Sequence, residues 1–332
     1  MSSQPPFFVS IGLFIIDDIV FTDTHCDSVS STIGGGGTYA TIGARIWLPP
    51  ARVGMIVDKG NDFPTDFHQK LLSYGRDVWL FREHTDRLTT RALNSYRGDI
   101  RNFEYLTPRL RLSPRDLRCT RLARPATLHF ICSPTRALQV ISEVDWNPTI
   151  IYEPIPDRCV PEELPTLRTA MASIDVLSPN AEEALALLSL SSPVTRDAVQ
   201  SAALCFLDFG VGPSGKGCVI IRSAALGACV ATRDTGCRWV DAFWTPQDTF
   251  HIVDVTGAGN SFLGGLAAGL ILENGDMYQA ALYASVSASF TIEQYGLPSL
   301  SVNSESGVEE WNEDSPRRRL EALRQRQSGQ QG

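Results

Sequence analysis

The stretch that decides the fold is VDVTGAGNSF at residues 253–262, which runs directly into the apolar LGGLAAGLIL at residues 263–272. The small residues at 257–259 let the backbone approach a ligand closely, and the helix that they open presents free N–H groups and the positive end of its dipole. These features predict an anion hole suited to a phosphate. The alternative is a tight turn between strand and helix in which Asn260 is an ordinary N-cap.

Strand-like and helix-like segments alternate along most of the chain, which favours a parallel sheet wrapped by helices. The expected strands cover residues 7–16, 77–81, 127–132, 149–153, 174–177, 218–222, 227–232 and 238–240. The expected helices cover residues 38–48, 64–74, 136–143, 162–171, 181–188, 261–272 and 277–291. The polar segments 18–33 and 83–112 interrupt this order, and we expect them to form a small flap.

Composition excludes several classes of protein. The 332 residues are 43% hydrophobic and 20% charged, so the chain can bury a sizeable core, and its net charge of −8 makes it a poor general binder of nucleic acid. The eight cysteines form no C-x-x-C pair and none lies near a His at zinc-finger spacing. The apolar stretch 7–16 is too short for a membrane span and lacks the basic start of a signal peptide. We therefore expect a cytoplasmic protein with no nucleic-acid or membrane partner.

The segment at residues 253–262 resembles the D-T-x-G-A-G-D-x-F signature of the PfkB (ribokinase-like) family of small-molecule kinases, with Val255 and Asn260 as the exceptions. Further landmarks follow the family in order. Gly12 is followed five residues later by Asp17, and the glycines at 34–37 open a helix.

Residues 179–183, PNAEE, look like the N-x-x-E motif of the family. The resemblance spans about residues 7–300. The chain is also similar to a fungal group of the family known from a killer-virus maintenance protein.

The resemblance implies a doubly wound, mainly parallel sheet flanked by helices, with a small β lid. It implies one ribokinase-like α/β domain over residues 1–310 with lid segments at about 18–33 and 83–112, followed by a charged tail at 311–332 that is helical or disordered. It also implies an ATP site near the C-terminal motifs, a sugar or nucleoside site under the lid, and a monomer or homodimer.

Carried over by position, the resemblance gives each site residue a role. The substrate side comprises Asp17, Gly35, Gly36 and Tyr39. The nucleotide side comprises Asn180, Glu183, Asp254 and Gly227, with Mg²⁺ held at Glu183 through water. The transferring phosphoryl group would lie at Gly257, Ala258, Gly259 and Asn260. These roles are chemically reasonable, because a carboxylate accepts hydrogen bonds from hydroxyls and phosphoryl transfer depends mainly on positioning and charge neutralisation.

Structural alternatives stand beside these roles. Asp17 could be a turn residue at the end of a strand, and Asp18 is the alternative for the substrate-binding position. Asn180 could cap a helix with Glu183 at its third position, as in a capping box.

Three departures from the family pattern affect the chemistry. Asn260 replaces the last acid of the signature, which is the general base, and a neutral amide cannot accept a proton; the loss of a general base typically costs ~10²–10⁴-fold in rate. Tyr39 stands where the family has an Asn, and a bulky phenol would change the acceptor pocket. The segment RSAALG at 222–227 keeps only Gly227 of the T-x-G-x-x-G stretch that contacts nucleotide in many members.

Two functions follow. The first is slow or atypical ATP-dependent phosphoryl transfer to a hydroxyl of a small sugar-, nucleoside- or polyol-like molecule, favoured by the glycine-rich turn and the N-x-x-E motif. The second is a catalytically inactive or repurposed protein of the same fold, either a metabolite- or nucleotide-binding regulator or a non-kinase enzyme, favoured by Asn260, Tyr39 and the broken T-x-G stretch.

Overall fold

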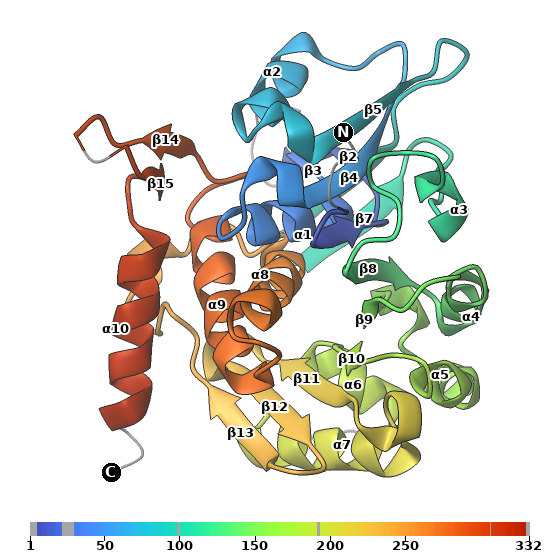
Figure 1. The fold of residues 1–332 in the computed structure, drawn as a ribbon, viewed down its shortest axis with the longest axis vertical. Coiled ribbons are helices and arrows are strands. Elements are labelled where there is room, and N and C mark those ends of the chain that lie inside the picture. Colours follow the sequence, from blue (N-terminus) through green and yellow to red (C-terminus); the bar gives the residue numbers. More distant parts are fainter. Residues whose placement is uncertain (1–4, 22–29, 98–99, 191–192, 306, 330–332) are drawn as a thin grey trace.

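A nine-stranded sheet forms the centre of the computed structural model, which describes residues 5–21, 30–97, 100–190, 193–305 and 307–329 (Figure 1). In the order in which they lie side by side, its strands are β13 (Gly236–Val240), β12 (Ala228–Thr232), β11 (Cys218–Arg222), β10 (Val176–Leu177), β9 (Thr149–Pro154), β8 (Thr127–Cys132), β1 (Phe8–Ser10), β4 (Val53–Lys59) and β5 (Trp79–Glu83). All neighbours are parallel except β11, β12 and β13, which pair antiparallel. Because β1 lies inside the sheet and later strands add on both sides of it, the sheet is doubly wound, as predicted.

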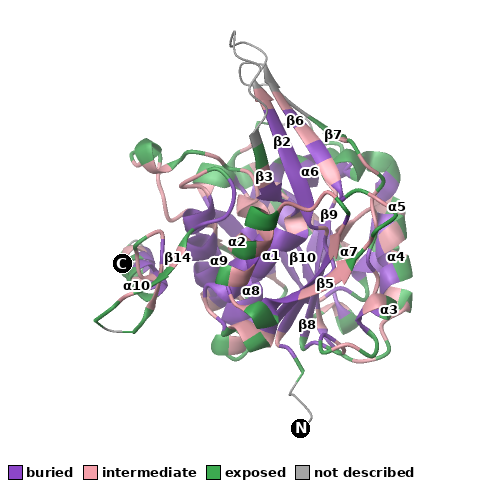
Figure 2. Cartoon of the chain, turned by 90° about the horizontal axis from the view of Figure 1, so that it is seen from above, coloured by how far each residue is buried: buried purple, intermediate pink, exposed green. Residues whose placement is uncertain are grey.

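Helices cover both faces of this sheet. One face carries α1 (Gly36–Arg45), α2 (Thr65–Ser73), α8 (Ala258–Leu272) and α9 (Met277–Thr291), and the other carries α3 (Pro114–Leu117), α4 (Pro134–Ser142), α5 (Leu164–Met171), α6 (Ala181–Leu187) and α7 (Arg196–Phe209). Side chains of the strands alternate between the two faces of the sheet and so enter both cores. In β11, Ile220 packs on the first face while Val219 and Ile221 pack on the second. Buried residues accordingly fill both sides of the sheet (Figure 2).

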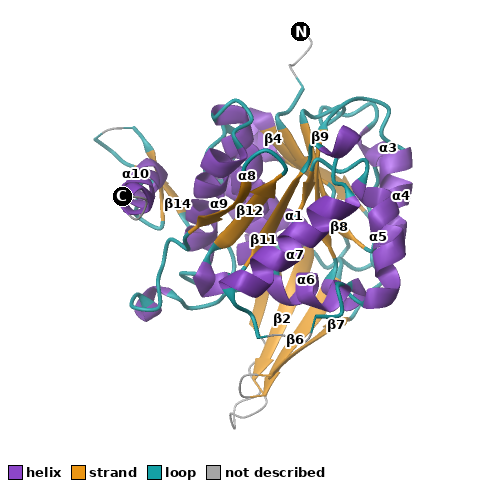
Figure 3. Ribbon diagram, turned by 90° about the horizontal axis from the view of Figure 1, so that it is seen from below, coloured by secondary structure: helices purple, strands orange, loops and turns teal. Residues whose placement is uncertain are grey.

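A second, four-stranded sheet projects from the body as the predicted lid (Figure 3). Its strands, in spatial order, are β3 (Ser30–Gly34), β2 (Ile15–Phe21), β6 (Arg91–Arg97) and β7 (Ile100–Tyr105). Much of the expected lid segment 18–33 lies outside the described residues, which omit 22–29, and residues 98–99 of the segment 83–112 lie outside them too. The fold class expected from the sequence, a doubly wound sheet with a small β lid, is confirmed.

Two predictions of secondary structure were wrong. The single strand expected at 7–16 is two strands, β1 in the central sheet and β2 in the lid, because the chain turns at Gly12, which packs against the backbone of Gly37. A Cβ on Gly12 would lie 2.7 Å from the Cα of Gly37. Helix α7 was not predicted, although its buried residues recur at helical spacing and Thr195 caps it by accepting from the N–H of Ala198.

The end of the chain is ordered over residues 316–329, where it forms α10 (Pro316–Gly329) beside α9 (Figure 1). A hairpin of β14 (Leu300–Val302) and β15 (Glu309–Trp311) precedes it. Leu320 and Leu323 bury α10 against the first core, so this tail packs as a helix instead of remaining disordered. Within the described ranges, we find no helix with the length and apolarity that a membrane crossing requires.

Candidate functional site

A cavity of about 450 Å³ opens between the antiparallel edge of the sheet and helices α8 and α9. Its polar end is formed by Asn180, Arg222 and Gly259, and an apolar wall is formed by Phe243 and Trp244 from the segment after β13. The volume lies in the range of small-molecule sites, and the combination of an apolar wall with a few polar groups at one end is typical of them.

The predicted anion hole lies at the polar end of this cavity, where the glycine turn at 257–259 begins α8. Gly257 has a left-handed φ of 79°, and a Cβ there would lie 2.2 Å from the ring of Tyr39. A Cβ on Gly259 would lie 1.9 Å from Nη1 of Arg222. Gly257 is therefore required by its left-handed φ and by the ring of Tyr39, whereas at Gly259 the flexible Arg222 side chain lies directly against the turn.

Asn260 stands next to these glycines and donates from Nδ2 to Oε2 of Glu153 over 2.7 Å. The other carboxylate oxygen of Glu153 forms an ion pair of 2.7 Å with Nη2 of Arg222. Burial opposes ionisation of Glu153, but the Arg222 guanidinium, together with His129 and Asn260, holds its pKa below the ordinary value. An ionised carboxylate thus lies in contact with Asn260, the position at which the resemblance predicts the general base.

Asn180 and Glu183 form the capping box that was the alternative interpretation of the N-x-x-E motif. Oδ1 of Asn180 accepts from the Glu183 N–H over 2.8 Å, and Oε2 of Glu183 accepts from the Asn180 N–H over 2.7 Å. Burial raises the pKa of Glu183 to about 7, although the Arg222 guanidinium, 3.8 Å away, opposes this shift. Asn180 lines the polar end of the cavity, and Glu183 lies next to two lining residues, Asn180 and Arg222.

These residues do not form a Mg²⁺ site of their own. Oδ1 of Asn180 and Oε2 of Glu183 accept the hydrogen bonds of the capping box. The carboxylates of Glu153 and Glu183 also lie next to the Arg222 guanidinium. Among the described residues, no group of three or more His, Cys, Asp or Glu side chains is placed to hold a metal ion. Mg²⁺ usually keeps several waters and binds through one or two carboxylates together with substrate phosphates, so a site here would depend on the nucleotide. The role of Glu183 through water stays a prediction.

On the lid side, the structure distinguishes the two candidate aspartates. Asp18 pairs with Arg91 at 3.0 Å and accepts from Ser31 at 2.6 Å, so it serves the lid itself. Asp17 is 6% exposed, and its carboxylate lies over Gly34, where a Cβ would come within 1.8 Å of Oδ2. This places Asp17 beside the glycine cluster that opens α1.

The same cluster approaches the residue at the base position. Gly35, with φ 93°, is the N-cap of α1, and a Cβ on Gly36 would lie 3.1 Å from Nδ2 of Asn260. Tyr39 is 3% exposed and belongs to the first core. Its ring packs directly against Gly257 of the glycine turn. The substrate-binding role of these residues stays a prediction.

The remaining candidates have local structural roles. Gly227 lines the cavity between β11 and β12 with a φ of 90°, and a Cβ there would lie 2.1 Å from the carbonyl oxygen of Val240. The carboxylate of Asp254 accepts from the Thr256 N–H over 3.0 Å and so shapes the turn that leads into α8.

Sequence reasoning missed Arg222, Glu153 and His129 as site residues. Glu153 lies near the carboxyl end of β9, and parallel sheets of this kind bind ligands at that edge. A carboxylate next to Pro154 at the end of an apolar strand was therefore a usable signal. Arg222 entered only as a departure from T-x-G-x-x-G, because its spatial relation to Gly259 is not visible in the sequence.

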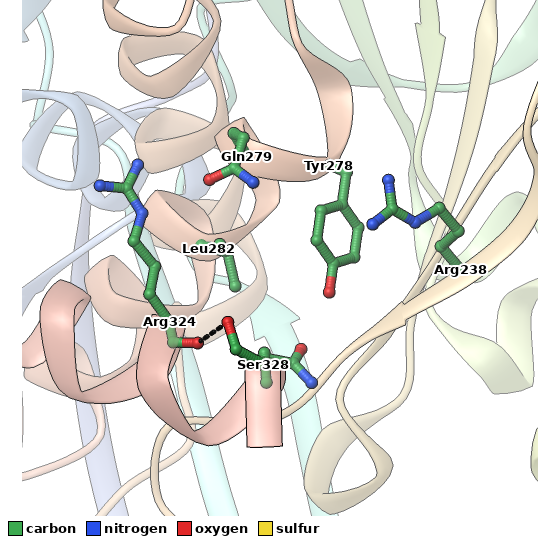
Figure 4. A pocket seen from close by; sticks show the side chains of 7 residues that line it. Arg238, Tyr278, Gln279, Leu282, Arg324 and Ser328 are labelled. Atoms are coloured by element: carbon green, nitrogen blue, oxygen red, sulfur yellow. Dashed lines mark hydrogen bonds between the residues drawn. The ribbon is translucent and has the colours of Figure 1, made fainter. Parts of the chain in front are cut away.

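A smaller cavity of about 220 Å³ lies between β13, α9 and α10 (Figure 4). Its cations are engaged, since Arg238 lies 3.6 Å from the ring centroid of Tyr278 and Arg324 donates to Glu273 over 2.7 Å. We therefore place the candidate site in the larger cavity.

A doubly wound sheet with a projecting β lid and a cavity that ends at a glycine turn defines a ribokinase-type fold. The chain matches the family described as pfkB family carbohydrate kinase over residues 6–303. It is 34% identical to an uncharacterised protein of Schizosaccharomyces pombe, with 94% of this chain and 91% of the relative covered. It is also 34% identical to Protein MAK32 of Saccharomyces cerevisiae, with 87% and 85% covered.

The chain belongs to the pfkB family of carbohydrate kinases, and the predicted likeness to a fungal group within it is confirmed. Among solved structures, it is similar to Arabidopsis thaliana ribokinase complexed with ribose and ATP, with a TM-score of 0.63, 19% identity, and 89% of this chain and 95% of that chain covered. At that identity the likeness concerns the fold.

Proposed function

We propose that this protein transfers a phosphoryl group from ATP to a hydroxyl of a small sugar-, nucleoside- or polyol-like molecule, and that it does so slowly. The observation that carries the proposal is the cavity lined by Ala258 and Gly259 of the glycine turn, next to which Asn260 meets Gly36 of the glycine cluster that lies beside Asp17. A helix start with small residues binds a phosphate, and a carboxylate binds hydroxyls. The solved ribokinase with ribose and ATP bound supports the same pair of ligands.

The chemistry available to this chain is positioning rather than proton removal at Asn260. Its amide can orient a hydroxyl but cannot take the proton, and its Nδ2 is engaged with Glu153. Phosphoryl transfer depends chiefly on placing the groups and neutralising charge, so the turn and its neighbours can still accelerate it. A proton that leaves the hydroxyl goes to another group or to water.

The second candidate is a protein of this fold that binds a nucleotide or metabolite without transferring phosphate. The specific observation in its favour is the contact between Asn260 and Glu153. The Asn260 amide binds one oxygen of Glu153 and Arg222 binds the other, so this carboxylate is engaged on both sides. Such a protein would act as a regulator or as an enzyme of another class.

The test measures ADP release with a panel of sugars, nucleosides and polyols. We compare the wild type, Asn260→Asp, and the double variant Asn260→Asp/Glu153→Gln, in which the neutral and charged members of the pair are exchanged. If the chain is a kinase, the wild type turns over slowly and the double variant is faster, by up to the ~10²–10⁴-fold that a general base supplies. Asn274→Asp, at an exposed position in the turn between α8 and α9, is the matched control.

The outcomes separate the two candidates. Turnover by no variant, together with a rise in melting temperature on adding ATP or ADP, supports the binding protein, because a ligand that binds only the folded state stabilises it by mass action. Absence of both turnover and stabilisation rejects both candidates.

A further inference from the structure

We propose that Arg222 is the phosphate-binding cation of this protein and supplies, at the glycine turn, the positive charge that the family resemblance attributes to Mg²⁺. The inference rests on the proposed binding of a nucleotide in the larger cavity and names the residue that recognises its phosphates. It concerns a position at which this chain departs from T-x-G-x-x-G.

Arg222 is placed for this role by the end of β11. It is the last residue of that strand and lines the cavity, while its guanidinium lies over the first turn of α8. The guanidinium lies so close to Gly259 that a Cβ on this residue would come within 1.9 Å of Nη1. A phosphate bound by the start of α8 would therefore meet the N–H groups of the helix and the guanidinium together.

The guanidinium can bind a phosphate without giving up its present partners. Nη2 donates to Glu153 over 2.7 Å and to the carbonyl oxygen of Ser178 over 3.0 Å. Nη1 is the nitrogen that lies against Gly259, whereas Nε is buried. Because a guanidinium carries five N–H donors in a planar fork, Nη2 can hold the carboxylate while Nη1 donates to the ligand.

The surrounding charges favour one fixed cation at this place. Glu153 and Glu183 approach Nη2 of Arg222 at 2.7 Å and 3.8 Å, and Arg222 is only 11% exposed. A metal ion next to the same carboxylates would have a guanidinium as its neighbour, and like charges in a poorly solvated site repel strongly. The dipole of α8 adds to the attraction of the guanidinium for a phosphate.

The experiment measures dissociation constants of ADP and adenosine by calorimetry, in EDTA and in excess Mg²⁺, using the full-length chain. Adenosine reports the apolar part of the cavity, so the ratio of the two constants isolates the phosphate contacts. In EDTA, the wild type is expected to bind ADP about tenfold or more tighter than adenosine, as a charge-assisted hydrogen bond implies. Mg²⁺ is expected to change the ADP constant by less than about threefold.

Two variants remove the cation. Arg222→Thr introduces the first residue type of the T-x-G motif but leaves Glu153 buried without its partner, which can impair folding. Arg222→Thr/Glu153→Gln removes both charges and avoids that problem. In each folded variant, ADP is expected to lose its advantage over adenosine in EDTA, while adenosine binding persists. Arg233→Thr is the matched control, because Arg233 follows β12 at the opposite end of the β11–β12 pair and donates to Leu207 over 3.1 Å.

The results distinguish this inference from the proposed function. If ADP and adenosine bind the wild type equally in EDTA and only Mg²⁺ strengthens ADP binding, the role of Arg222 is overturned while the proposed function stands. Retention of the ADP advantage by the double variant also overturns it. If the wild type binds neither compound under either condition, the proposed function fails and the role of Arg222 fails with it.

Discussion

Replacing Asn260 with aspartate tests the contact at the centre of the site. Nδ2 of Asn260 lies 2.7 Å from Oε2 of Glu153, so Asn260→Asp would bring two carboxyl groups together. Two unit charges about 4 Å apart repel by about 4 kcal/mol at an effective dielectric constant of 20. Arg222, paired with the other oxygen of Glu153, offsets part of this, and we expect a net cost of ~2 kcal/mol when both groups are ionised.

The cost appears as a dependence of stability on pH. Repulsion raises the pKa of the introduced carboxyl in the folded state by about 1.5 above its unfolded value, since one pKa unit corresponds to ~1.4 kcal/mol. An acid whose folded pKa is raised leaves stability intact while it is protonated, and stability falls as pH rises through the folded pKa. The loss begins near the unfolded pKa of about 3.9 and is complete above the folded pKa of about 5.4, so Asn260→Asp should match the wild type near pH 3.5 and melt about 4 °C lower at pH 8.

Thermal unfolding at pH 3.5 and pH 8 measures this effect, because these values lie on either side of the titration. Asn260→Asp/Glu153→Gln should lose the extra pH dependence, because only one carboxyl remains, and Asn274→Asp controls for an added surface charge. A difference in melting temperature between Asn260→Asp and the wild type that is the same at both pH values would refute the inferred contact. It would also remove the reason for pairing the two substitutions in the kinase assay.

Two further predictions concern the C-terminal helix and the capping box. Arg319 is 5% exposed and pairs with Glu293 at 2.6 Å and Asp314 at 2.8 Å, so Arg319→Ala should cost ~3–5 kcal/mol and lower the melting temperature by about 6 °C or more. Arg318→Ala, at a neighbour that is 74% exposed, should cost no more than about 0.5 kcal/mol, and equal losses would contradict the buried role of Arg319. Burial raises the pKa of Glu183 to about 7, so the wild type should lose stability as pH rises through that value, by up to about 3 kcal/mol. Denaturant unfolding at pH 5.5 and pH 8 should show a smaller loss for Glu183→Gln, and identical pH profiles would argue against a buried, ionisable Glu183.

The sequence predicted the fold because the turn, the helices and the strands that define it each form mainly through residues that are close in the chain. The run at 253–272 encodes the glycine turn and helix α8, and the alternation of strands and helices encodes the doubly wound sheet. The capping box of Asn180 and Glu183 is also local, since its partners are three residues apart.

The strand expected at 7–16 was wrong, and the tail was left open between a helix and disorder, because in both cases a distant segment decides the local structure. The missed helix α7 differs, since its signal is local. The strand expected at 7–16 breaks because Gly12 meets Gly37, and no window around residue 12 contains that contact. The tail at 316–329 has a charged composition, yet it folds because Arg319 and two leucines pack on α9. Burial supplied by other elements outweighed the local composition.

The sequence by itself determined that a glycine turn begins one helix, and that an amide stands where the family signature has its last acid. Only the tertiary structure decided what surrounds that turn. Asn260 meets Glu153, which is 107 residues earlier, and the end of β11 brings Arg222 over Gly259. The reason is physical: the ends of separate strands meet at one edge of a sheet, and the charges gathered there depend on strand order, which no local pattern records.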